Sequence, residues 1–497
     1  MPPQDSNFPA AVDDATRREL QENLRPLQWR NPQPAPSYSL VVIGGGPAGL
    51  TAARAAAEAG VRVALIEREL IGGDCLNFGC EPSKALIRTA RLYAEMREAR
   101  HYGAEVPAGI GVDFSAAMQR VLALRARLSR GDSVAALREA GIDVFFGQAR
   151  FASPDEMDID GLPLRFERAL IATGGKPDVP AIPGLAGIGY YTNESIFDIA
   201  QLPRRLLVIG GGPLGCELAQ VFCRFGSKTI IVQDMPLFLP KEERDAAQIL
   251  SVSFARDGIE VRLNTTVTGI REVDGEIRAD LLSDDYRSTI TVDAVLIGTG
   301  RLPRIDGMDL ENAGIGYDAA AGIHVDDFLC TSNPRVYAAG DACLEDMFTH
   351  AAVASAEVAV DNALHDEQRR MSALAIPWCT YTDPEIAHVG LYVRDAMQQR
   401  IAVSTFTIPL HAVDRAILDG EDTGFVKIHV ADGSERILGA TIVSAHAGEM
   451  ISQVTLAMVA GIGMSQLAQV IHPYPTQSAA IGMAAQAWLR SREPSAS

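Results

Sequence analysis

Hydrophobic and polar positions along the chain predict two copies of one unit, made of a strand, a glycine-rich turn, a helix and a second strand. In the first copy an apolar strand over residues 39–43 leads into the turn and an alanine-rich helix, and a second apolar strand covers 61–66. In the second copy the strands cover 205–209 and 228–232, with a helix over 216–222 between them. Continuously apolar strands that alternate with helices are typical of parallel sheets buried on both faces, so we expect an α/β fold.

The turn of each unit carries the dinucleotide fingerprint G-x-G-x-x-G. Glycines at this spacing let the backbone and the helix N-terminus approach a pyrophosphate, while an acidic residue after the second strand accepts hydrogen bonds from ribose hydroxyls. That residue is Glu67 in the first unit, whereas the second unit has Gln233 and then Asp234, with no Arg or Lys before Pro240. Because a 2'-phosphate needs a positive partner, the second unit favours NADH, with NADPH as the alternative. The fingerprint glycines are Gly44, Gly46 and Gly49 in the first unit and Gly210, Gly212 and Gly215 in the second.

Later apolar runs also end in glycine turns. Those at 170–174 and 295–300 are interpreted as strands that end where the chain crosses between domains. A further strand ends at Gly340 and Asp341, and the pattern predicts that this pair opens a helix over about 348–364. Asp341 could cap that helix, or it could accept hydrogen bonds from a polyol chain.

The two ends of the chain carry no nucleotide-binding signal. Residues 1–36 are polar and rich in proline, with a short helix expected around 13–24. From residue 376 onward the pattern predicts alternating strands, then two helices and a polar tail after Trp488. The strands are expected over 405–410, 424–430 and 438–443. This last region is interpreted as a dimerisation module.

Composition narrows the classes of function. The chain of 497 residues is long enough for more than one domain, and a hydrophobic content of 47% is enough for large cores. A formal net charge of −19 argues against sequence-independent binding of nucleic acid, which needs clustered Lys and Arg. Seven cysteines, an odd number, do not resemble a secreted disulfide framework. The sequence shows neither a signal peptide nor a membrane span, so we expect a cytoplasmic protein.

Two cysteines five positions apart, Cys75 and Cys80, lie in the stretch Gly72–Lys84, directly after the first nucleotide-binding unit. A helix N-terminus favours a thiolate, so the pair could form a reversible disulfide that acts as a redox switch. Two nearby cysteines are more often inert buried thiols. Their position favours the redox interpretation, because the thiols would lie beside the ligand of the first unit.

Taken together, these motifs resemble the flavin-dependent pyridine nucleotide-disulfide oxidoreductases, the family of glutathione reductase, dihydrolipoamide dehydrogenase and mercuric reductase. The resemblance extends from about Tyr38 to Trp488, roughly nine tenths of the chain. The matching segments are Gly44–Gly49, Gly72–Lys84, the Thr-Gly turns at 173 and 299, Gly210–Glu217, Val336–Asp341 and Asp383–Ala387.

The resemblance implies two Rossmann-like dinucleotide-binding domains, one for FAD and one for NAD(P), and a C-terminal α+β dimerisation domain. It therefore implies a homodimer. The implied boundaries are a polar N-terminal arm over 1–36, an FAD domain over 37–178 and 301–371, an NAD(P) domain over 179–300, a dimerisation domain over 372–490 and a tail over 491–497.

The resemblance also implies roles for individual residues. Cys75 is similar to the interchange thiol that meets the substrate, and Cys80 to the flavin-proximal thiol. Lys84 would lie near flavin N5 and pair with Glu217, because a buried cation needs a counter-charge. The first fingerprint and Asp341 would hold FAD. The further residues expected at the cofactors are Glu67, Gly73, Thr173, Gly174, Gln233, Gly300 and His350.

The sequence departs from the family at its proton shuttle. Disulfide reductases of the family carry a His-Pro-Thr segment with a glutamate three residues after the threonine, contributed across the dimer. Here Tyr474 occupies the histidine position and Ala479 the glutamate position, and a phenol is no base at neutral pH. His472, two residues earlier, could substitute or could simply pack. Glu81 is another departure, and its carboxylate would raise the pKa of Cys80 unless it points to solvent.

A tyrosine at this position is similar to mercuric reductases, in which thiolates handle a soft metal ion without a thiol proton shuttle. Those enzymes also share a C-terminal cysteine pair, whereas this sequence has no cysteine after Cys379. We therefore expect an enzyme in which NAD(P)H reduces FAD, FAD reduces the Cys75–Cys80 disulfide, and the dithiol reduces a soft metal ion or small electrophile. The alternatives are a low-molecular-weight disulfide reductase that uses His472, and a redox-responsive flavin-binding sensor without efficient turnover.

Overall fold

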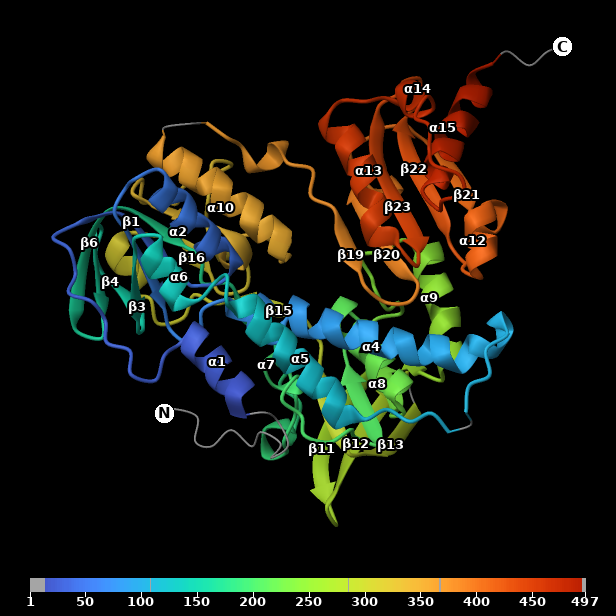
Figure 1. Ribbon diagram of the computed structural model, residues 1–497, viewed down its shortest axis with the longest axis horizontal. Helices are drawn as coiled ribbons and strands as arrows, with labels where there is room; N and C mark the ends of the chain where they lie inside the picture. Colours follow the sequence, from blue (N-terminus) through green and yellow to red (C-terminus); the bar gives the residue numbers. More distant parts are fainter. Residues whose placement is uncertain (1–13, 108, 285, 366–367, 494–497) are drawn as a thin grey trace.

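The computed structural model describes residues 14–107, 109–284, 286–365 and 368–493. Two mainly parallel sheets with flanking helices and one antiparallel C-terminal sheet make up the molecule, as Figure 1 shows. This arrangement confirms the expected fold class of two Rossmann-like units and a C-terminal α+β unit.

The first sheet places the strands in the order β3-β2-β1-β6-β5-β4, and β18 pairs with β6. Its parallel part is β1 (Tyr38–Ile43), β2 (Val63–Glu67), β3 (Ile142–Phe146), β6 (Leu162–Ile171) and β18 (Val336–Ala338), and the antiparallel extension is β4 (Ala149–Ser153) and β5 (Glu156–Ile159). Leu40 and Val42 pack on one face and Val41 and Ile43 on the other, as the two-residue period of a strand requires. Both faces are buried, which explains the unbroken apolar run.

Helices α2 (Pro47–Glu58) and α10 (Thr349–Leu364) lie side by side on one face of this sheet. The prediction that Gly340 and Asp341 open the second of these helices is wrong. The pair forms a separate 3-10 turn, Gly340–Ala342, and the helix begins at Thr349. The segment between them instead lines the cavity described below.

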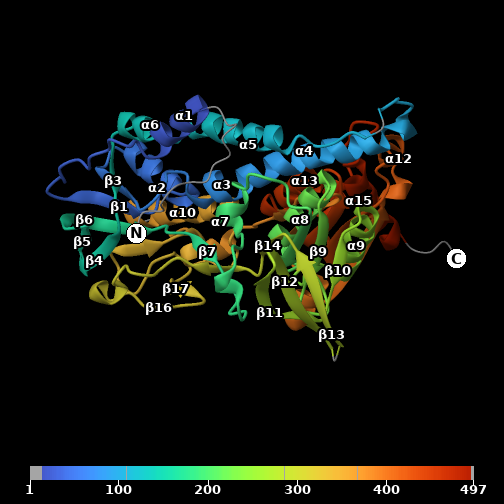
Figure 2. The same cartoon turned by 90° about the horizontal axis from the view of Figure 1, so that it is seen from below.

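The second parallel sheet has the order β10-β9-β8-β14. A separate three-stranded antiparallel sheet lies beside it, as Figure 2 shows. Its strands are β8 (Arg205–Ile209), β9 (Lys228–Val232), β10 (Glu260–Arg262) and β14 (Ala294–Ile297), and its helices are α8 (Pro213–Phe225) and α9 (Arg244–Asp257). The antiparallel strands are β11 (Thr265–Val273), β12 (Glu276–Ser283) and β13 (Tyr286–Val292). Between the two parallel sheets the outgoing strand β7 (Gly175–Pro177) pairs with the returning strand β15 (Arg301–Pro303).

The C-terminal sheet is antiparallel, with the order β19-β20-β23-β22-β21. Its strands are β19 (Trp378–Thr380), β20 (Glu385–Gly390), β21 (Val403–Pro409), β22 (Phe425–Ala431) and β23 (Ile437–Ser444). Helices α13 (Ala447–Val459), α14 (Met464–Leu467) and α15 (Ala479–Arg492) follow. The hydrophobic pattern predicted the last three strands and missed β19 and β20, partly because the polar residue His388 is buried within β20.

The predicted N-terminal helix is present as α1 (Asp14–Leu24), and residue 13 lies outside the described part of the chain. Leu20 and Leu24 of this helix are buried in the core of the first unit, and α1 packs against α5 (Phe114–Ser129). Within the described residues, no helix combines the length and the apolar character needed to cross a membrane.

Candidate active site

A cavity of about 1820 Å³ lies where the two parallel sheets and the start of β19 meet. It brings together residues that are far apart in the sequence and that sequence analysis selected separately. These are Gly44, Gly46, Glu67, Gly73, Cys75, Cys80, Lys84, Thr173, Gly174, Gly210, Gly212, Glu217, Gln233, Gly300, Asp341 and His350. Of the other selected residues, Gly49 and Gly215 lie inside the strand–helix packing, and His472 and Tyr474 lie on the C-terminal unit.

The first glycine turn leaves no room for a side chain at Gly44 or Gly49. Gly44 has a φ of +107°, and a Cβ there would lie 2.3 Å from the carbonyl oxygen of Ala172. A Cβ on Gly49 would lie 1.8 Å from the carbonyl oxygen of Gly44, so the helix packs directly on the turn. The N-terminus of α2 therefore opens into the cavity with its N–H groups accessible to an anion.

Glu67 and Gln233 occupy equivalent positions in the two units and make the same bond to their turns. Glu67 Oε2 accepts a hydrogen bond from the Gly45 N–H at 2.6 Å, and Gln233 Oε1 accepts one from the Gly211 N–H at 2.6 Å. Burial raises the pKa of Glu67. Gln233 keeps the acceptor that holds the turn but is uncharged, and its Nε2 donates to Asp234.

The two cysteines lie on consecutive helices, α3 (Gly73–Phe78) and α4 (Cys80–Glu98). Cys80 is the first residue of α4, both thiols are free, and each shifts the pKa of the other. The Cys80 Sγ also lies 3.3 Å from the Thr349 Oγ1. The hydrogen bond from Cys75 and the charge of Lys84 lower the pKa of Cys80, while the same bond and burial raise the pKa of Cys75. The structure thus favours a thiolate on Cys80 and a protonated thiol on Cys75.

Lys84 and Glu217 form an ion pair across the cavity wall, with the Lys84 Nζ 2.9 Å from the Glu217 Oε2. Glu217 is only 4% exposed, and its Oε1 accepts a hydrogen bond from the Tyr381 N–H at 2.8 Å. Burial alone would lower the pKa of Lys84, but the charge and hydrogen bond of Glu217 together with the charge of Cys80 outweigh it, and the pKa is raised. The lysine is therefore held as a cation beside the thiols.

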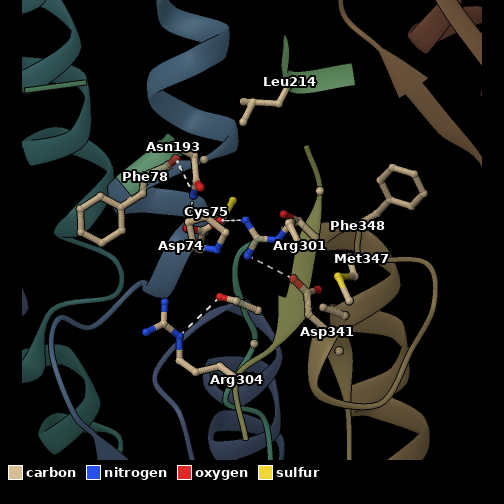
Figure 3. Close-up of a pocket in the computed structure, with 18 of the residues that line it drawn as sticks. Asp74, Cys75, Phe78, Asn193, Leu214, Arg301, Arg304, Asp341, Met347 and Phe348 are labelled. Atoms are coloured by element: carbon tan, nitrogen blue, oxygen red, sulfur yellow. Dashed lines mark hydrogen bonds and ion pairs between the residues drawn. The ribbon is translucent and has the colours of Figure 1, made fainter. Parts of the chain in front are cut away.

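A second charged cluster, which sequence analysis missed apart from Asp341, lies on the cavity wall drawn in Figure 3. Arg301 contacts Asp74 at 2.7 Å and Asp341 at 3.3 Å, and Asn193 donates to Asp74 at 2.8 Å. Asp74 directly precedes Cys75, and Arg301 directly follows Gly300, which was expected at a cofactor. The sequence could therefore have indicated both residues only through their position next to a motif. Two polar atoms of this wall, the Thr173 Oγ1 and the Arg301 Nε, are buried without a hydrogen-bond partner in the described structure.

Comparison with known proteins identifies the family. Residues 38–363 match the pyridine nucleotide-disulphide oxidoreductase model, and residues 376–485 match the dimerisation domain of the same family. The chain belongs to this family. Its members use FAD and NAD(P)H, and the second match supports a homodimer.

Relatives within the family have different names. The chain is 33% identical to a mercuric reductase of Lysinibacillus sphaericus over 90% of this chain and 82% of that protein. It is 32% identical to a dihydrolipoyl dehydrogenase of Thermus scotoductus over 91% and 97% of the two chains. The HOCl-induced flavoprotein disulfide reductase RclA from Escherichia coli superposes with a TM-score of 0.81 at 30% identity, covering 90% of this chain and 99% of the other. Its Cu(II) complex superposes with a TM-score of 0.80 at 30% identity, covering 89% and 98%.

Tyr474 and His472, at the position of the family's proton shuttle, do not line the cavity of their own chain. Tyr474 is 80% exposed, and its hydroxyl donates to Asp414 at 2.9 Å. His472 accepts from the Gln453 Nε2 at 2.8 Å and packs against Gly482. His350 is the one histidine among the described residues along this cavity, and it is stacked on Phe348 with its Nε2 bonded to the Pro377 carbonyl.

Glu81 is partly buried, and its Oε2 lies out of solvent without a hydrogen-bond partner among the described residues. Burial, together with Asp132 and Cys80, raises the pKa of Glu81. Its charge contributes to the raised pKa of Cys75, whereas the pKa of Cys80 is lowered. The repulsion between the Glu81 carboxylate and a Cys80 thiolate opposes that thiolate, as expected, but the hydrogen bond from Cys75 and the charge of Lys84 dominate and leave the pKa of Cys80 lowered.

This electrostatic arrangement predicts a pH dependence. In the reduced, FAD-loaded protein a Cys80 thiolate next to the flavin should give a thiolate–flavin charge-transfer absorbance. The pKa of Cys80 is lowered to about 6, so this absorbance should be present above that pH and should disappear as the pH falls through about 6. Removal of the hydrogen-bond donor in Cys75→Ala should raise the midpoint by at least ~1 pH unit. Cys75→Ser keeps a donor and should stay close to the unsubstituted protein. A midpoint unchanged in Cys75→Ala would contradict the role of this bond.

Proposed function

We propose that this protein passes electrons from NAD(P)H through FAD to the Cys75–Cys80 pair, and that the dithiol reduces a soft metal ion or a small electrophilic acceptor. The observation that carries the proposal is the pair itself. Two free thiols line the same cavity as both nucleotide-binding turns and the Lys84–Glu217 pair.

The first unit suits FAD. The open N-terminus of α2 is suited to a pyrophosphate and Glu67 to a ribose, while Asp341 lies beside the unpartnered Arg301 Nε and Thr173 Oγ1. When bound, FAD supplies hydride acceptance from NAD(P)H and two-electron reduction of a disulfide. We assign the second unit to NAD(P)H, with Gln233 at the adenosine ribose and NADH preferred, since Gln233 and Asp234 offer no cation to a 2'-phosphate.

Residues of the chain have separate roles in binding and reducing the acceptor. Lys84 provides a fixed positive charge on the wall of the cavity, compensated by Glu217. Cys80 is the thiolate and Cys75 the thiol, so a soft cation that binds both sulfurs displaces one proton, from Cys75. As the disulfide re-forms, the two electrons of the dithiolate pass to the acceptor, either to one ion such as Hg(II), which becomes Hg(0), or to two Cu(II) ions, which become Cu(I). Thiolates bind soft metals in preference to hard ones, which gives the class of ion.

Tyr474 and Ala479, in place of the family's histidine and glutamate, support a metal ion or electrophile over a disulfide substrate. A disulfide substrate leaves as a thiol and needs a proton donor, whereas a bound metal ion does not. Relatives point the same way, since several are named mercuric reductases and a Cu(II) complex is known for RclA. Low-molecular-weight disulfide reduction remains the second candidate, favoured by the relative named dihydrolipoyl dehydrogenase.

We propose a homodimer formed through the C-terminal unit. Large apolar side chains stand exposed on α13 and on the segment that leads to α15, where they would otherwise be in water. They are Leu456, Val459, Val470, Ile471 and Tyr474. A partner on this surface would bury Tyr474 and could bring it towards the partner's dithiol.

An acceptor screen tests the proposed function. Purified protein is given NADH or NADPH in parallel, with Hg(II), Cu(II), lipoamide or oxidised glutathione as the acceptor, and nucleotide oxidation is followed. We expect turnover with a metal ion to exceed turnover with either disulfide by at least ~10-fold, with NADH the better donor. Faster turnover with lipoamide or glutathione would overturn the metal assignment. Flavin reduction without turnover on any acceptor would favour the sensor alternative.

A further inference from the structure

Tyr381 contacts both members of the ion pair that stands beside the thiols. Its ring lies under the Lys84 ammonium, with the Nζ 4.5 Å from the ring centroid, and its N–H donates to the Glu217 Oε1 at 2.8 Å. We propose that Tyr381 is a positioning residue that fixes the Lys84 ammonium over the reacting part of the cavity. This inference rests on the proposed role of Lys84 at the flavin.

The argument starts from the freedom of a lysine side chain. Four rotatable bonds and three equivalent donors allow the ammonium to take many positions, and one ion pair with Glu217 leaves most of them open. An aromatic face attracts a cation within about 6 Å of its centroid, and more strongly where water is excluded. The ring therefore supplies a second, independent restraint on Nζ, from a direction that Glu217 does not cover.

Tyr381 is itself held firmly, although it belongs to the turn between β19 and β20 of the C-terminal sheet. The next residues of this turn are bonded to α8, the helix that carries Glu217. Asp383 donates its N–H to the Gln220 Oε1 at 2.8 Å and accepts from Arg224 at 2.7 Å. The Tyr381 ring and the Glu217 carboxylate are thus both held by α8. The distance between them therefore does not depend on the C-terminal sheet alone.

The ring face and the main chain carry these contacts. Among the described residues, the Tyr381 hydroxyl has no hydrogen-bond partner, and the side chain is 37% exposed and lines the cavity. Burial and the nearby Cys379 raise the pKa of this phenol to about 12, so it stays neutral at working pH. A phenylalanine at this position should therefore still hold the Lys84 ammonium, whereas an aliphatic residue should not.

The test compares Tyr381→Leu with Tyr381→Phe in the FAD-loaded protein. Three quantities are measured: the single-turnover rate of flavin reduction by NADH, the flavin midpoint potential, and the charge-transfer absorbance after two-electron reduction. In Tyr381→Leu we expect the rate to fall roughly tenfold and the potential to become more negative by a comparable factor, about 30 mV for two electrons. The absorbance should also weaken. Tyr381→Phe should stay within about twofold of the unsubstituted protein.

A matched control removes another ring from another lysine. Phe425 lies 4.6 Å from the Lys427 Nζ on the C-terminal sheet, away from the cavity. Phe425→Leu should leave the flavin potential and absorbance unchanged even if it lowers thermal stability. A normal potential in Tyr381→Leu would overturn the proposal, and so would a loss in Tyr381→Phe, which can be measured even if Tyr381→Leu does not fold.

Lys84→Met separates this inference from the proposed function. If Lys84→Met slows flavin reduction and Tyr381→Leu does not, the role of Tyr381 fails and that of Lys84 stands. If Lys84→Met leaves flavin reduction unchanged, the role of Lys84 at the flavin fails, and the inference about Tyr381 fails with it.

Discussion

In Cys80→Ser, turnover on any acceptor should fall by at least ~10³-fold, and the charge-transfer absorbance should vanish, while NADH still reduces the bound flavin. The reason is that Cys80 is the only one of the two thiols that the structure favours as a thiolate. A serine hydroxyl at this position can neither form the disulfide nor give up its proton at neutral pH. The measurements are stopped-flow flavin reduction, the visible spectrum after two-electron reduction, and steady-state turnover.

Cys330→Ser is the matched control for this experiment. Cys330 is also a partly exposed cysteine, but it does not line the cavity, and its thiol donates to the Thr331 carbonyl. The control should keep both the absorbance and the turnover. A charge-transfer band that survives in Cys80→Ser would show that the other sulfur, Cys75, faces the flavin.

Gly44→Ala should weaken FAD binding by roughly 100-fold or more and give protein that purifies without colour. The added Cβ would meet the Ala172 carbonyl oxygen at 2.3 Å, at a φ of +107° that alanine avoids. The equivalent change in the second unit, Gly210→Ala, brings a Cβ to 2.4 Å from the Gly298 carbonyl oxygen. That variant should keep its FAD and lose reduction by NADH. Bound flavin is measured by absorbance, and nucleotide affinity by titration.

Two other glycines serve as controls that separate the effect of the steric clash from the effect of a positive φ. Gly60 and Gly226 also have positive φ, +77° and +115°, but a Cβ at either would meet nothing within 4 Å. Gly60→Ala and Gly226→Ala should therefore bind FAD and NADH normally, although the strain of a positive φ lowers their stability. If Gly210→Ala lost FAD and Gly44→Ala kept it, the assignment of the two units would have to be exchanged.

The local patterns predicted the elements that carry nucleotides almost to the residue. Strand β8 covers the predicted range, Arg205–Ile209, and β1 and β2 differ from prediction by one or two residues. Apolar runs bounded by glycine turns have few other solutions. The two missed strands of the C-terminal sheet were harder to predict. His388 is buried because it hydrogen-bonds to Thr441 and Gly390, and these bonds leave no local pattern in the sequence.

The same division holds for the site. Cys75, Cys80, Lys84 and Glu217 could be selected because each belongs to a short motif with its own spacing. Tyr381 belongs to the neighbouring C-terminal region, and only its position in space shows that it faces Lys84. Arg301 likewise meets Asp74 across more than two hundred residues of sequence, with no periodicity linking the two.

The sequence by itself determined that the protein has two glycine-rich nucleotide turns, two cysteines five positions apart, and a tyrosine where the family's disulfide reductases carry a histidine, since each is a matter of residue type at a fixed local spacing. Only the tertiary structure decided which sulfur is favoured as a thiolate, which charges surround it, and which ring faces the lysine. Those properties depend on distances and burial between distant segments, and electrostatic energies change steeply with both.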